Sequence, residues 1–442
     1  MRYLDSLNLK SNIECFILIE PGLGFLIPVL QERYKTSKIV VLHIDDFPQK
    51  EGIPTLNSIE TSDIQKFLET HIPEIDIDRI KIIEWRASMN FYKDKYVKIL
   101  SQVVEFLKRT DAGKRTTAVF GRRWVKNFFR NIANVNHPLL YKQAAVPVIV
   151  TGSAPGLEQA IPVIQKAQEK CLIIAASSSV MALSAGGITA DIVIATDGGS
   201  WALKHIYPFY RSNNTAALAV NLCAALPSQC ANTPTLLIND GSFWQSLILH
   251  ALSLPSLIIP QRGTVTATAV ELAMILSSGN IYLAGMDFSV DDIRTHTRPY
   301  SFDSLFFSGA TRLTPFYSQS FTRSSLLREG GSMEIYAQWF KSQLAKWSKK
   351  IFSIGGNAIF DRGLPPEHTD KKKTYEYFKA ATAGETSLFV KRGVEALLSA
   401  IDNREYEKNL KQELIPLLFP GEDNVTEKEL KTAIKEIAGL KD

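Results

Sequence analysis

Short apolar runs and longer stretches with helical spacing alternate along most of this chain. The pattern is clearest in the central segment, residues 145–287, where the runs are apolar throughout and predict strands. These candidate strands occupy residues 148–150, 172–175, 191–197, 216–220, 235–238, 257–259 and 281–284. Helical patterns at residues 158–170 and 265–276 lie between them. Apolar strands that alternate with helices predict an α/β fold with a doubly wound, mostly parallel sheet.

The first part of the chain shows the same alternation on a smaller scale. A candidate strand at residues 15–19 runs into the turn EPGLGF, a helix to Arg33 and a second strand at residues 39–44. Glycines in such a turn either let a ligand approach the backbone or simply make the turn, and an isolated GxG favours the second explanation. Residues 92–133 are helical and basic, which is typical of a solvated helix face.

After Asp287 the pattern is loop-like and polar, and from Ser332 it is mostly helical apart from a strand-like stretch at residues 351–360. A single hydrophobic core stops growing near ~250 to 300 residues, so this chain needs more than one domain. We predict an N-terminal α/β domain over residues 1–140, a central ligand-binding domain over 141–330 and a mostly helical C-terminal region over 331–442.

The charge balance narrows the classes of partner. The chain has 50 Lys and Arg against 45 Asp and Glu, a net charge of +5. No predicted helix has the dense basic face that a nucleic-acid duplex needs, so we expect no nucleic-acid partner, whereas an anionic small ligand suits a mild positive balance. The 4 cysteines form no CxxC pair, which supports neither a disulfide framework nor a zinc site.

Two features bear on the location of the chain. Acidic residues interrupt the apolar run near the N-terminus that a signal peptide would need. Residues 171–190 form an uncharged stretch with the length of a membrane span, but their serines and glycines fit a strand, a turn and a short helix better. We therefore expect a cytoplasmic protein without a membrane span.

The stretch TGSAPGL follows the first central strand and precedes a helix. A glycine-rich turn in this place brings backbone N–H groups and the positive end of the helix dipole to one point, which favours a phosphate there. The stretch lacks the lysine of a P-loop and is not a GxGxxG motif, so a purely structural turn explains it about as well.

Asp197 and Asp287 each follow an apolar strand and precede a loop. At such positions a carboxylate could bind ribose hydroxyls, orient an acceptor or hold Mg²⁺. The pattern favours a function for Asp197, because the two glycines after it have little structural purpose beyond a turn. Capping of the next loop explains Asp287 equally well. The sequence demands no cofactor, and Mg²⁺ is the metal ion that these carboxylates suggest.

Three further side chains are candidates. Arg262 could face the anionic part of a nucleotide, whereas capping of the helix that begins there is enough to explain Thr264. His296 is the single histidine in the polar loop beyond the sheet. A neutral imidazole there could remove a proton from an acceptor hydroxyl, although a loop histidine without a function is the simpler interpretation.

Five motifs together resemble those of a known family. In order they are TGSAPGLEQ, AASSSVMAL, GGITADIVIATDGG, GTVTATAVELA and IYLAGMDFS, within residues 148–296. This arrangement is similar to the MptE-like domain of the motility accessory factor (Maf) proteins of flagellated bacteria. Outside it, the turn EPGLGF and the stretches FGRRWVKNF and FSIGGNAIF also look like the flanking regions of Maf proteins.

The resemblance implies a flagellin glycosyltransferase with a central fold similar to bacterial sialyltransferases. Such an enzyme moves a nonulosonic acid of the pseudaminic or legionaminic type from its CMP carrier to Ser or Thr hydroxyls of flagellin. The resemblance also implies that His296 is the catalytic base and that Asp197 and Asp287 lie in the catalytic site. The residues implied to line the nucleotide are Gly152, Ser153, Ala154, Gly156, Ser177, Ser178 and Asp197. The run GSAPGL, where the family commonly has a GPSL-like run, and the segment after Asp287 depart from the family pattern.

Two other functions fit the same residues. MptE itself shares the central domain, which suggests an ATP-dependent pyrophosphokinase acting on a hydroxymethylpterin, with Mg²⁺ on Asp197 and Asp287. The large flanking regions are unnecessary for such a compact kinase. The other alternative is a catalytically silent scaffold that binds a flagellar or envelope partner. Ligand binding and activity separate the three functions.

Overall fold

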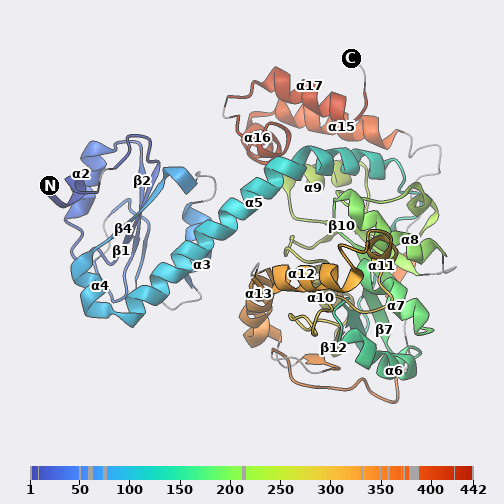
Figure 1. The fold of residues 1–442 in the computed structure, drawn as a ribbon. Helices are drawn as coiled ribbons and strands as arrows, with labels where there is room; N and C mark the ends of the chain where they lie inside the picture. The colour runs from blue at the N-terminus through green and yellow to red at the C-terminus, as the bar shows by residue number, and fades with distance from the viewer. Residues whose placement is uncertain are drawn as a thin grey trace. The chain divides into compact units, whose positions relative to one another are not determined.

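The computed structural model describes residues 2–7, 9–48, 51–57, 63–72, 77–211, 216–329, 332–347, 350–355, 359–369, 371, 374–377, 388–422 and 424–440. The chain forms two compact units, Met1–Thr117 and Ala118–Asp442. Helix α5 (Asp94–Ile132) begins in the first unit and ends in the second (Figure 1).

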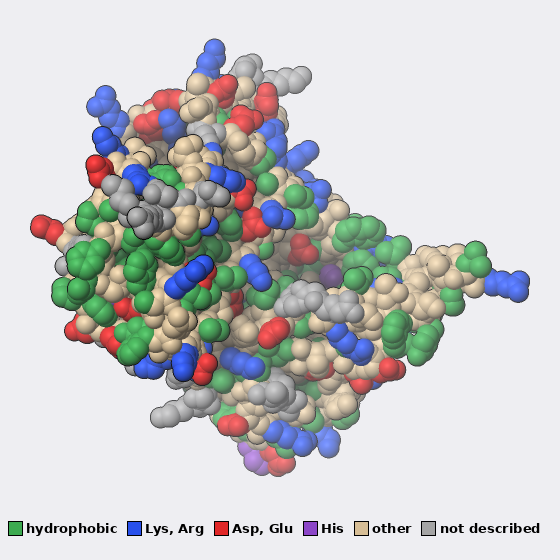
Figure 2. Space-filling view, turned by 60° about the vertical axis from the view of Figure 1, so that its left-hand side comes forward, with side chains coloured by type: hydrophobic (Ala, Val, Ile, Leu, Met, Phe, Trp, Pro, Cys, Tyr) green, Lys and Arg blue, Asp and Glu red, His purple; other side chains and the backbone are tan. Residues whose placement is uncertain are grey.

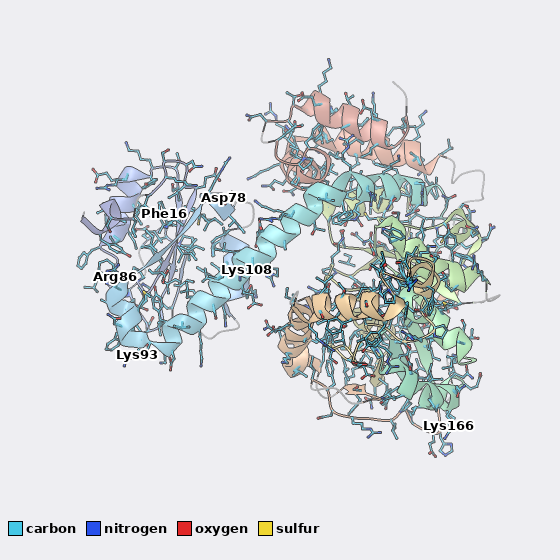
Figure 3. The ribbon with its side chains drawn as sticks, in the orientation of Figure 1. Phe16, Asp78, Arg86, Lys93, Lys108 and Lys166 are labelled. Carbon is cyan, nitrogen blue, oxygen red and sulfur yellow. The ribbon has the colours of Figure 1, made fainter. Side chains whose placement is uncertain are left out.

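The first unit contains a four-stranded parallel sheet in the order β3-β2-β1-β4. Its strands are β1 (Cys15–Ile19), β2 (Lys38–Leu42), β3 (Thr55–Leu56) and β4 (Ile80–Glu84). Its other elements are α1 (Arg2–Asp5), α2 (Leu26–Arg33), α3 (Asp63–His71), η1 (Ile77–Arg79) and α4 (Arg86–Tyr92). Successive residues of β1 enter opposite cores, with Ile17 in one and Phe16 in the other, where the Phe16 ring packs edge-on against Tyr34 (Figure 3).

The glycine turn after β1 has a structural explanation. Gly22 and Gly24 have φ angles of +61° and +69°, which L side chains rarely adopt. Glu20 before them is fully buried, and its carboxylate accepts a hydrogen bond from the Ile44 amide at 2.6 Å and lies 3.2 Å from His43 Nδ1. These contacts hold the turn against the end of β2 and support the structural interpretation of the GxG.

The second unit contains an eight-stranded sheet in the order β11-β10-β9-β8-β7-β6-β12-β13. All of its strand pairs are parallel, which confirms the predicted doubly wound α/β fold. Its strands are β6 (Val148–Thr151), β7 (Leu172–Ala176), β8 (Ile192–Ala195), β9 (Ala217–Asn221), β10 (Thr235–Asn239), β11 (Leu257–Ile258), β12 (Ile281–Ala284) and β13 (Ile351–Ser353). A separate antiparallel pair joins β5 (Leu139–Tyr141) to β14 (Tyr375–Tyr377).

Helices cover both faces of this sheet, which is why its strands are apolar throughout. Ile149 and Ile173 enter the core under the helices α6 (Leu157–Ala167), α7 (Val180–Ala185), α8 (Leu203–Arg211) and α9 (Phe243–Ala251). Val150 and Ile174 enter the opposite core under α10 (Val265–Leu276) and α13 (Ser332–Trp347). The C-terminal helices α15 (Phe389–Ile401), α16 (Arg404–Leu418) and α17 (Glu427–Ile437) join the first of these cores, beside α9 (Figure 1).

The end of α5 fixes the loops that follow β8 and β9. Asn127 Nδ2 donates to the carbonyls of Gly198 at 3.2 Å and Cys223 at 3.0 Å. Asn131 Nδ2 donates to the carbonyls of Leu222 at 2.7 Å and Ala224 at 2.8 Å. The basic residues of the same stretch are exposed, as predicted for a solvated face.

The segment after Asp287 is more ordered than its sequence predicts. The loop-like interpretation is wrong over α11 (Asp303–Ser308) and α12 (Phe316–Glu329). The apolar residues of α12 are spread around the helix instead of forming one stripe, so helical periodicity does not show in the sequence. The predicted domain boundaries at residues 140 and 330 stay predictions. The strand β13 and the helices α15 to α17 share one compact unit with the central sheet.

Charged side chains of both signs are interspersed over the face drawn in Figure 2. Among the described residues, no helix is long and apolar enough to cross a membrane.

Candidate functional site

The sheet of the second unit changes direction between β6 and β12. From β6 the chain adds strands outward to β11, and it then returns to place β12 on the other side of β6. Doubly wound sheets bind ligands at the carboxyl ends of their strands near such a switch point. The loops that leave β6, β7, β8 and β12 at this edge contain most of the predicted site residues.

The glycine turn after β6 packs against the turn after β12. Gly152 N donates to Ala284 O at 2.8 Å, and Ala154 N donates to Gly285 O at 3.0 Å. A Cβ on Gly152 would overlap the Gly285 carbonyl oxygen, and a Cβ on Gly285, which has a φ of +65°, would lie 2.6 Å from the Gly152 oxygen. Glycine is therefore needed at both positions for the two backbones to meet.

Asp287 takes the position at the start of α6 where the sequence suggests a phosphate. Its Oδ2 accepts a hydrogen bond from Gly156 N at 2.6 Å, and a Cβ on Gly156 would lie 2.5 Å from Oδ1. Burial raises the pKa of Asp287, and the Gly156 hydrogen bond opposes that rise. The amides of Gly152, Ala154 and Gly156 thus donate within the chain, so a phosphate here would have to displace Asp287 or use neighbouring groups such as Ser153.

The serines after β7 form the short helix η2 (Ser177–Ser179). Ser177 is buried and Ser178 is half-buried. Ser179, which the sequence did not single out, is fully buried, and its Oγ lies 2.8 Å from Thr151 Oγ1 and donates to Ala176 O at 2.8 Å. It therefore joins the ends of β6 and β7, and Ser178 is left as the more accessible of the two predicted serines.

Asp197 lies in an exposed turn after β8. Its Oδ1 accepts a hydrogen bond from Gly199 N at 2.8 Å. A Cβ on Gly198 would overlap the Trp124 ring and lie 2.9 Å from Cys223 O, so the first of the two glycines is required by packing. The glycine pair that favoured a function for Asp197 consequently has a structural purpose as well.

The two candidate carboxylates follow strands that are not neighbours in the sheet. β7 and β6 lie between β8 and β12, and at ~4.8 Å per strand the ends of β8 and β12 are roughly 14 Å apart. Mg²⁺ binds its oxygen ligands at about 2.0 to 2.1 Å. Within the described residues no group of three His, Cys, Asp or Glu side chains is arranged to hold a metal ion.

Arg262 and Thr264 are engaged with other parts of the chain. Arg262 pairs with Glu271, with Nε to Oε1 at 3.1 Å and Nη2 to Oε1 at 3.0 Å, and its guanidinium lies 5.7 Å from the centre of the Trp339 ring. Thr264 occupies the N-cap position of α10, but its hydroxyl lies 2.8 Å from the Thr266 hydroxyl and makes no capping bond. The contact of either residue with a nucleotide stays a prediction.

The loop that carries His296 is anchored to the glycine turn and to the first turn of α6. Thr297 N donates to Ser153 O at 2.8 Å. Glu158 holds two further groups of the loop: Oε1 accepts from Arg298 N at 3.0 Å, and Oε2 accepts from Arg294 Nη1 at 3.0 Å. The loop thereby brings His296 next to the switch point.

His296 is a neutral, oriented imidazole. Its ring stacks on Tyr300, with centroids 4.2 Å apart and the planes 13° from parallel, and its Nδ1 lies 2.9 Å from Thr295 Oγ1. Burial, with smaller effects of His205 and Arg323, lowers the pKa of His296 to about 4. At pH 7 the ring is uncharged, and its Nε2 has no hydrogen-bond partner in the part of the chain that the structure describes.

A pocket of about 370 Å³ opens beside His296 and has mostly apolar walls. Trp201 comes from the short helix η3 (Ser200–Ala202) that follows β8, the Tyr300 ring from the loop after β12, and Arg323 from α12. The remaining lining residues are Thr295, Phe302, Leu305, Phe306, Leu326 and Leu327. A concave apolar site with a few polar groups is the usual form of a small-molecule site.

A second histidine backs this pocket. His205, on α8, has its ring centroid 5.4 Å from that of Tyr300 and 5.0 Å from that of Phe302, and its Nδ1 lies 2.5 Å from Ser301 Oγ. Burial lowers its pKa to about 4, and the negative charge of Asp197 opposes that shift. Asp197 is thus close enough to influence the electrostatics of the pocket.

Sequence reasoning missed several residues of this site. Trp201 and His205 follow the DGG turn directly, so their place after a strand end was a usable signal. Arg323 lies on a helix that the pattern did not predict, and Glu158 looked like an ordinary helix residue. No local signal in the sequence connects these last two to His296.

By its fold and its pocket, the second unit is a doubly wound α/β domain with a pocket at the edge of the sheet where the strand order reverses. Residues 122–292 match the model of the family described as 6-hydroxymethylpterin diphosphokinase MptE-like. The predicted MptE-like central domain is therefore confirmed.

Two individual proteins are similar to this chain over most of its length. An uncharacterised protein of Treponema pallidum (strain Nichols) is 27% identical over 348 residues, which cover 78% of this chain and 73% of that protein. A solved structure described as the Maf glycosyltransferase from Magnetospirillum magneticum AMB-1 aligns over 96% of this chain and 72% of its own, with 13% identity and a TM-score of 0.49.

Proposed function

We propose that this protein is a cytoplasmic glycosyltransferase that moves a nonulosonic acid from a CMP-sugar to Ser or Thr hydroxyls of flagellin. The donor and the acceptor follow from the resemblance of the five central motifs to Maf proteins. The MptE-like domain supports the proposal because those motifs lie within or close to residues 122–292.

The pocket beside His296 is the observation that carries the proposal. Its aromatic rings offer flat apolar surfaces to a sugar ring, and the few polar groups among them can fix its orientation. A neutral imidazole at the same place can accept a proton from a hydroxyl. An acid sugar, a leaving group at the strand ends and an acceptor hydroxyl would all fit within reach of this edge of the sheet.

In this reaction the protein mainly stabilises charge and positions the reacting groups. Loss of CMP from a 2-keto sugar leaves an oxocarbenium-like anomeric carbon, while negative charge gathers on the departing phosphate. We assign stabilisation of that phosphate to the turns after β6 and β7, where Ser153 and Ser178 remain accessible. His296 accepts the proton of the acceptor hydroxyl as its oxygen bonds to the anomeric carbon. Asp287 holds the glycine turn in place through Gly156.

A second function deserves a test because the matching family description names a pterin diphosphokinase. An aromatic pocket could also hold a flat pterin ring. The kinase hypothesis places Mg²⁺ on carboxylates such as Asp197 and Asp287, which follow the strands β8 and β12 with two other strands between them. We prefer the glycosyltransferase because stretches outside the central domain also resemble Maf proteins, whereas a compact kinase does not need the large flanking regions.

Ligand binding separates the two functions. A ligand that binds only the folded chain raises its apparent stability, so purified protein is heated with CMP, CDP, ATP and GTP, each with and without Mg²⁺. Stabilisation by CMP without metal is the expected result. A Mg²⁺-dependent shift with ATP and none with CMP would favour the pyrophosphokinase, and no shift with any nucleotide would favour a scaffold without catalytic activity.

A further inference from the structure

Arg323 is a half-buried cation that lacks a carboxylate partner among the described residues. Its guanidinium carbon lies 3.9 Å from the centre of the Phe306 ring and 5.9 Å from that of Phe316. Its hydrogen bond goes to a neutral group, from Nη2 to Ser320 Oγ at 3.0 Å. Asp303 acts on it only through space, while the Asp303 carboxylate accepts a hydrogen bond from Tyr300 N at 2.8 Å.

The surroundings of Arg323 add positive charge. Arg298 lies with its guanidinium carbon 5.4 Å from the centre of the same Phe316 ring, and it makes no ion pair in the described part of the chain. Burial and the charge of Arg298 lower the pKa of Arg323. Nearby Arg294 differs, because it pairs with both Glu158 and Asp291. Arg323 is a half-buried cation that lines an apolar pocket without a carboxylate partner among the described residues, and this arrangement favours an anionic ligand because an unpaired, partly buried charge is unfavourable.

The glycosyltransferase proposal already requires a donor sugar in this pocket, and on that basis we propose that Arg323 binds the carboxylate of an acidic sugar whose ring lies against the aromatic wall. A guanidinium presents parallel N–H donors that match both oxygens of a carboxylate. The contact with the Phe306 ring and the hydrogen bond to Ser320 restrict the guanidinium before a ligand binds, which reduces the side-chain entropy lost when a carboxylate binds.

A carboxylate fits this position better than a phosphate. Arg323 is the cation among the residues that line this mostly apolar pocket, and it offers one planar pair of N–H donors, which matches the two oxygens of a carboxylate. The strand-end turns, which present the hydroxyls of Ser153 and Ser178, are the better location for the phosphate of the donor. Arg323 is therefore a specificity residue for the sugar and has no role toward the nucleotide.

The test measures binding by titration calorimetry with the full chain and four probes. The probes are CMP, N-acetylneuraminate as a free acidic sugar, its neutral methyl ester, and CMP-N-acetylneuraminate. The variants are Arg323→Gln, which removes the charge, and Arg323→Lys, which keeps the charge but loses the paired donors. Arg312→Gln is the matched control, because Arg312 is exposed and makes no ion pair among the described residues. Melting temperatures establish that each variant is folded.

We expect Arg323→Gln to weaken N-acetylneuraminate and CMP-N-acetylneuraminate about tenfold or more, the size of a charge-assisted hydrogen bond. Arg323→Lys should weaken both less, and CMP should bind all variants equally. The methyl ester should bind weakly, with the same affinity for the unmodified protein and for both Arg323 variants. Unchanged affinity for the acidic sugars in Arg323→Gln would overturn the inference, and so would an equal loss for CMP, which would make Arg323 a phosphate ligand.

The outcomes also separate this inference from the proposed function. If the unmodified protein binds CMP and the acidic sugar but Arg323→Gln behaves like it, the inference fails and the proposed function stands. If the acidic sugar binds in an Arg323-dependent way but CMP does not bind, the inference stands and the CMP-linked function fails. If neither probe binds the unmodified protein, both fail.

Discussion

Glu158 links the His296 loop to α6, so its replacement tests whether that loop must be held in place for activity. In Glu158→Ala the amide of Arg298 and the guanidinium of Arg294 lose the carboxylate oxygens that now lie 3.0 Å from each. The bond from Thr297 N to Ser153 O at 2.8 Å remains as the anchor between this loop and the glycine turn.

The magnitude follows from these two contacts. A hydrogen bond to a charged group contributes about 1.5 to 3 kcal/mol, and an exposed ion pair about 0 to 1 kcal/mol. The side chains of Glu158 and Arg294 are each 35% exposed, so solvent screens both interactions and the lower part of the range applies. We expect a loss of about 1 to 2 kcal/mol in loop anchoring, a factor of about 5 to 30 in the ratio of anchored to released loop.

The assay is release of CMP from a CMP-activated acidic sugar in the presence of flagellin. Glu158→Ala should lower kcat/KM by up to that factor of about 5 to 30, while the affinity for CMP alone stays unchanged. Glu158→Gln should have a kcat/KM between those of the unmodified protein and Glu158→Ala, because its carbonyl oxygen can still accept a hydrogen bond from the Arg298 amide. Glu169→Ala, which removes an exposed carboxylate past the other end of α6, is the control. Unaltered kcat/KM in a folded Glu158→Ala protein would refute the role of the anchored loop.

Three other substitutions test separate parts of the account. Asp287→Ala should destabilise the protein by about 1 to 3 kcal/mol in chemical unfolding, because Gly156 N loses its acceptor, whereas Asp287→Asn should be close to neutral. Because burial raises the pKa of Asp287 in the folded protein, the side chain contributes most to stability below its unfolded pKa and less as pH rises through its folded pKa. The stability of Asp287→Asn relative to the unmodified protein should therefore increase from acid to neutral pH. His296→Gln should lower kcat about 10²- to 10⁴-fold, with loss of an acidic limb near pH 4 in the kcat/KM profile, and an intact limb would point to another base. Because the folded pKa of His296 lies below its ordinary 6.5, its contribution to stability is present above pH 6.5 and is lost as pH falls toward 4. His296→Gln should remove this part of the dependence of stability on pH. Gly152→Ala should lower the melting temperature by several degrees, since its Cβ would overlap the Gly285 carbonyl, whereas Gly113→Ala in α5, with open space around it, should raise stability slightly; equal effects would contradict the packing argument.

The parallel sheet was predictable because its strands leave a pattern within short stretches of sequence. A strand buried on both faces has to be apolar at every position, and runs such as residues 172–176 and 192–195 show this directly. The polar edge of the sheet follows from the same logic, since charged and glycine residues gather where the apolar runs end. The helix α12 escaped prediction because it lacks a single apolar stripe.

The contacts within the site were not predictable, because they join residues far apart in the sequence. Gly156 and Asp287 are separated by 131 positions, and only the fold shows that the carboxylate caps the helix where a phosphate seemed the natural partner. The same holds for the ion pair between Arg262 and Glu271, which the sequence does not reveal. Sequence identifies which residue types lie at the edge of the sheet, but the partners of each decide which remain available.

The most direct test of the glycosyltransferase is transfer itself. Purified protein is incubated with flagellin and a CMP-activated nonulosonic acid, and the intact mass of flagellin is measured, with the His296→Gln protein in a parallel reaction. The account predicts that flagellin gains the mass of one or more sugar residues with the unmodified protein and gains little or none with the variant. Flagellin of unchanged mass with the unmodified protein, under conditions where the CMP-sugar binds, would contradict the proposed function.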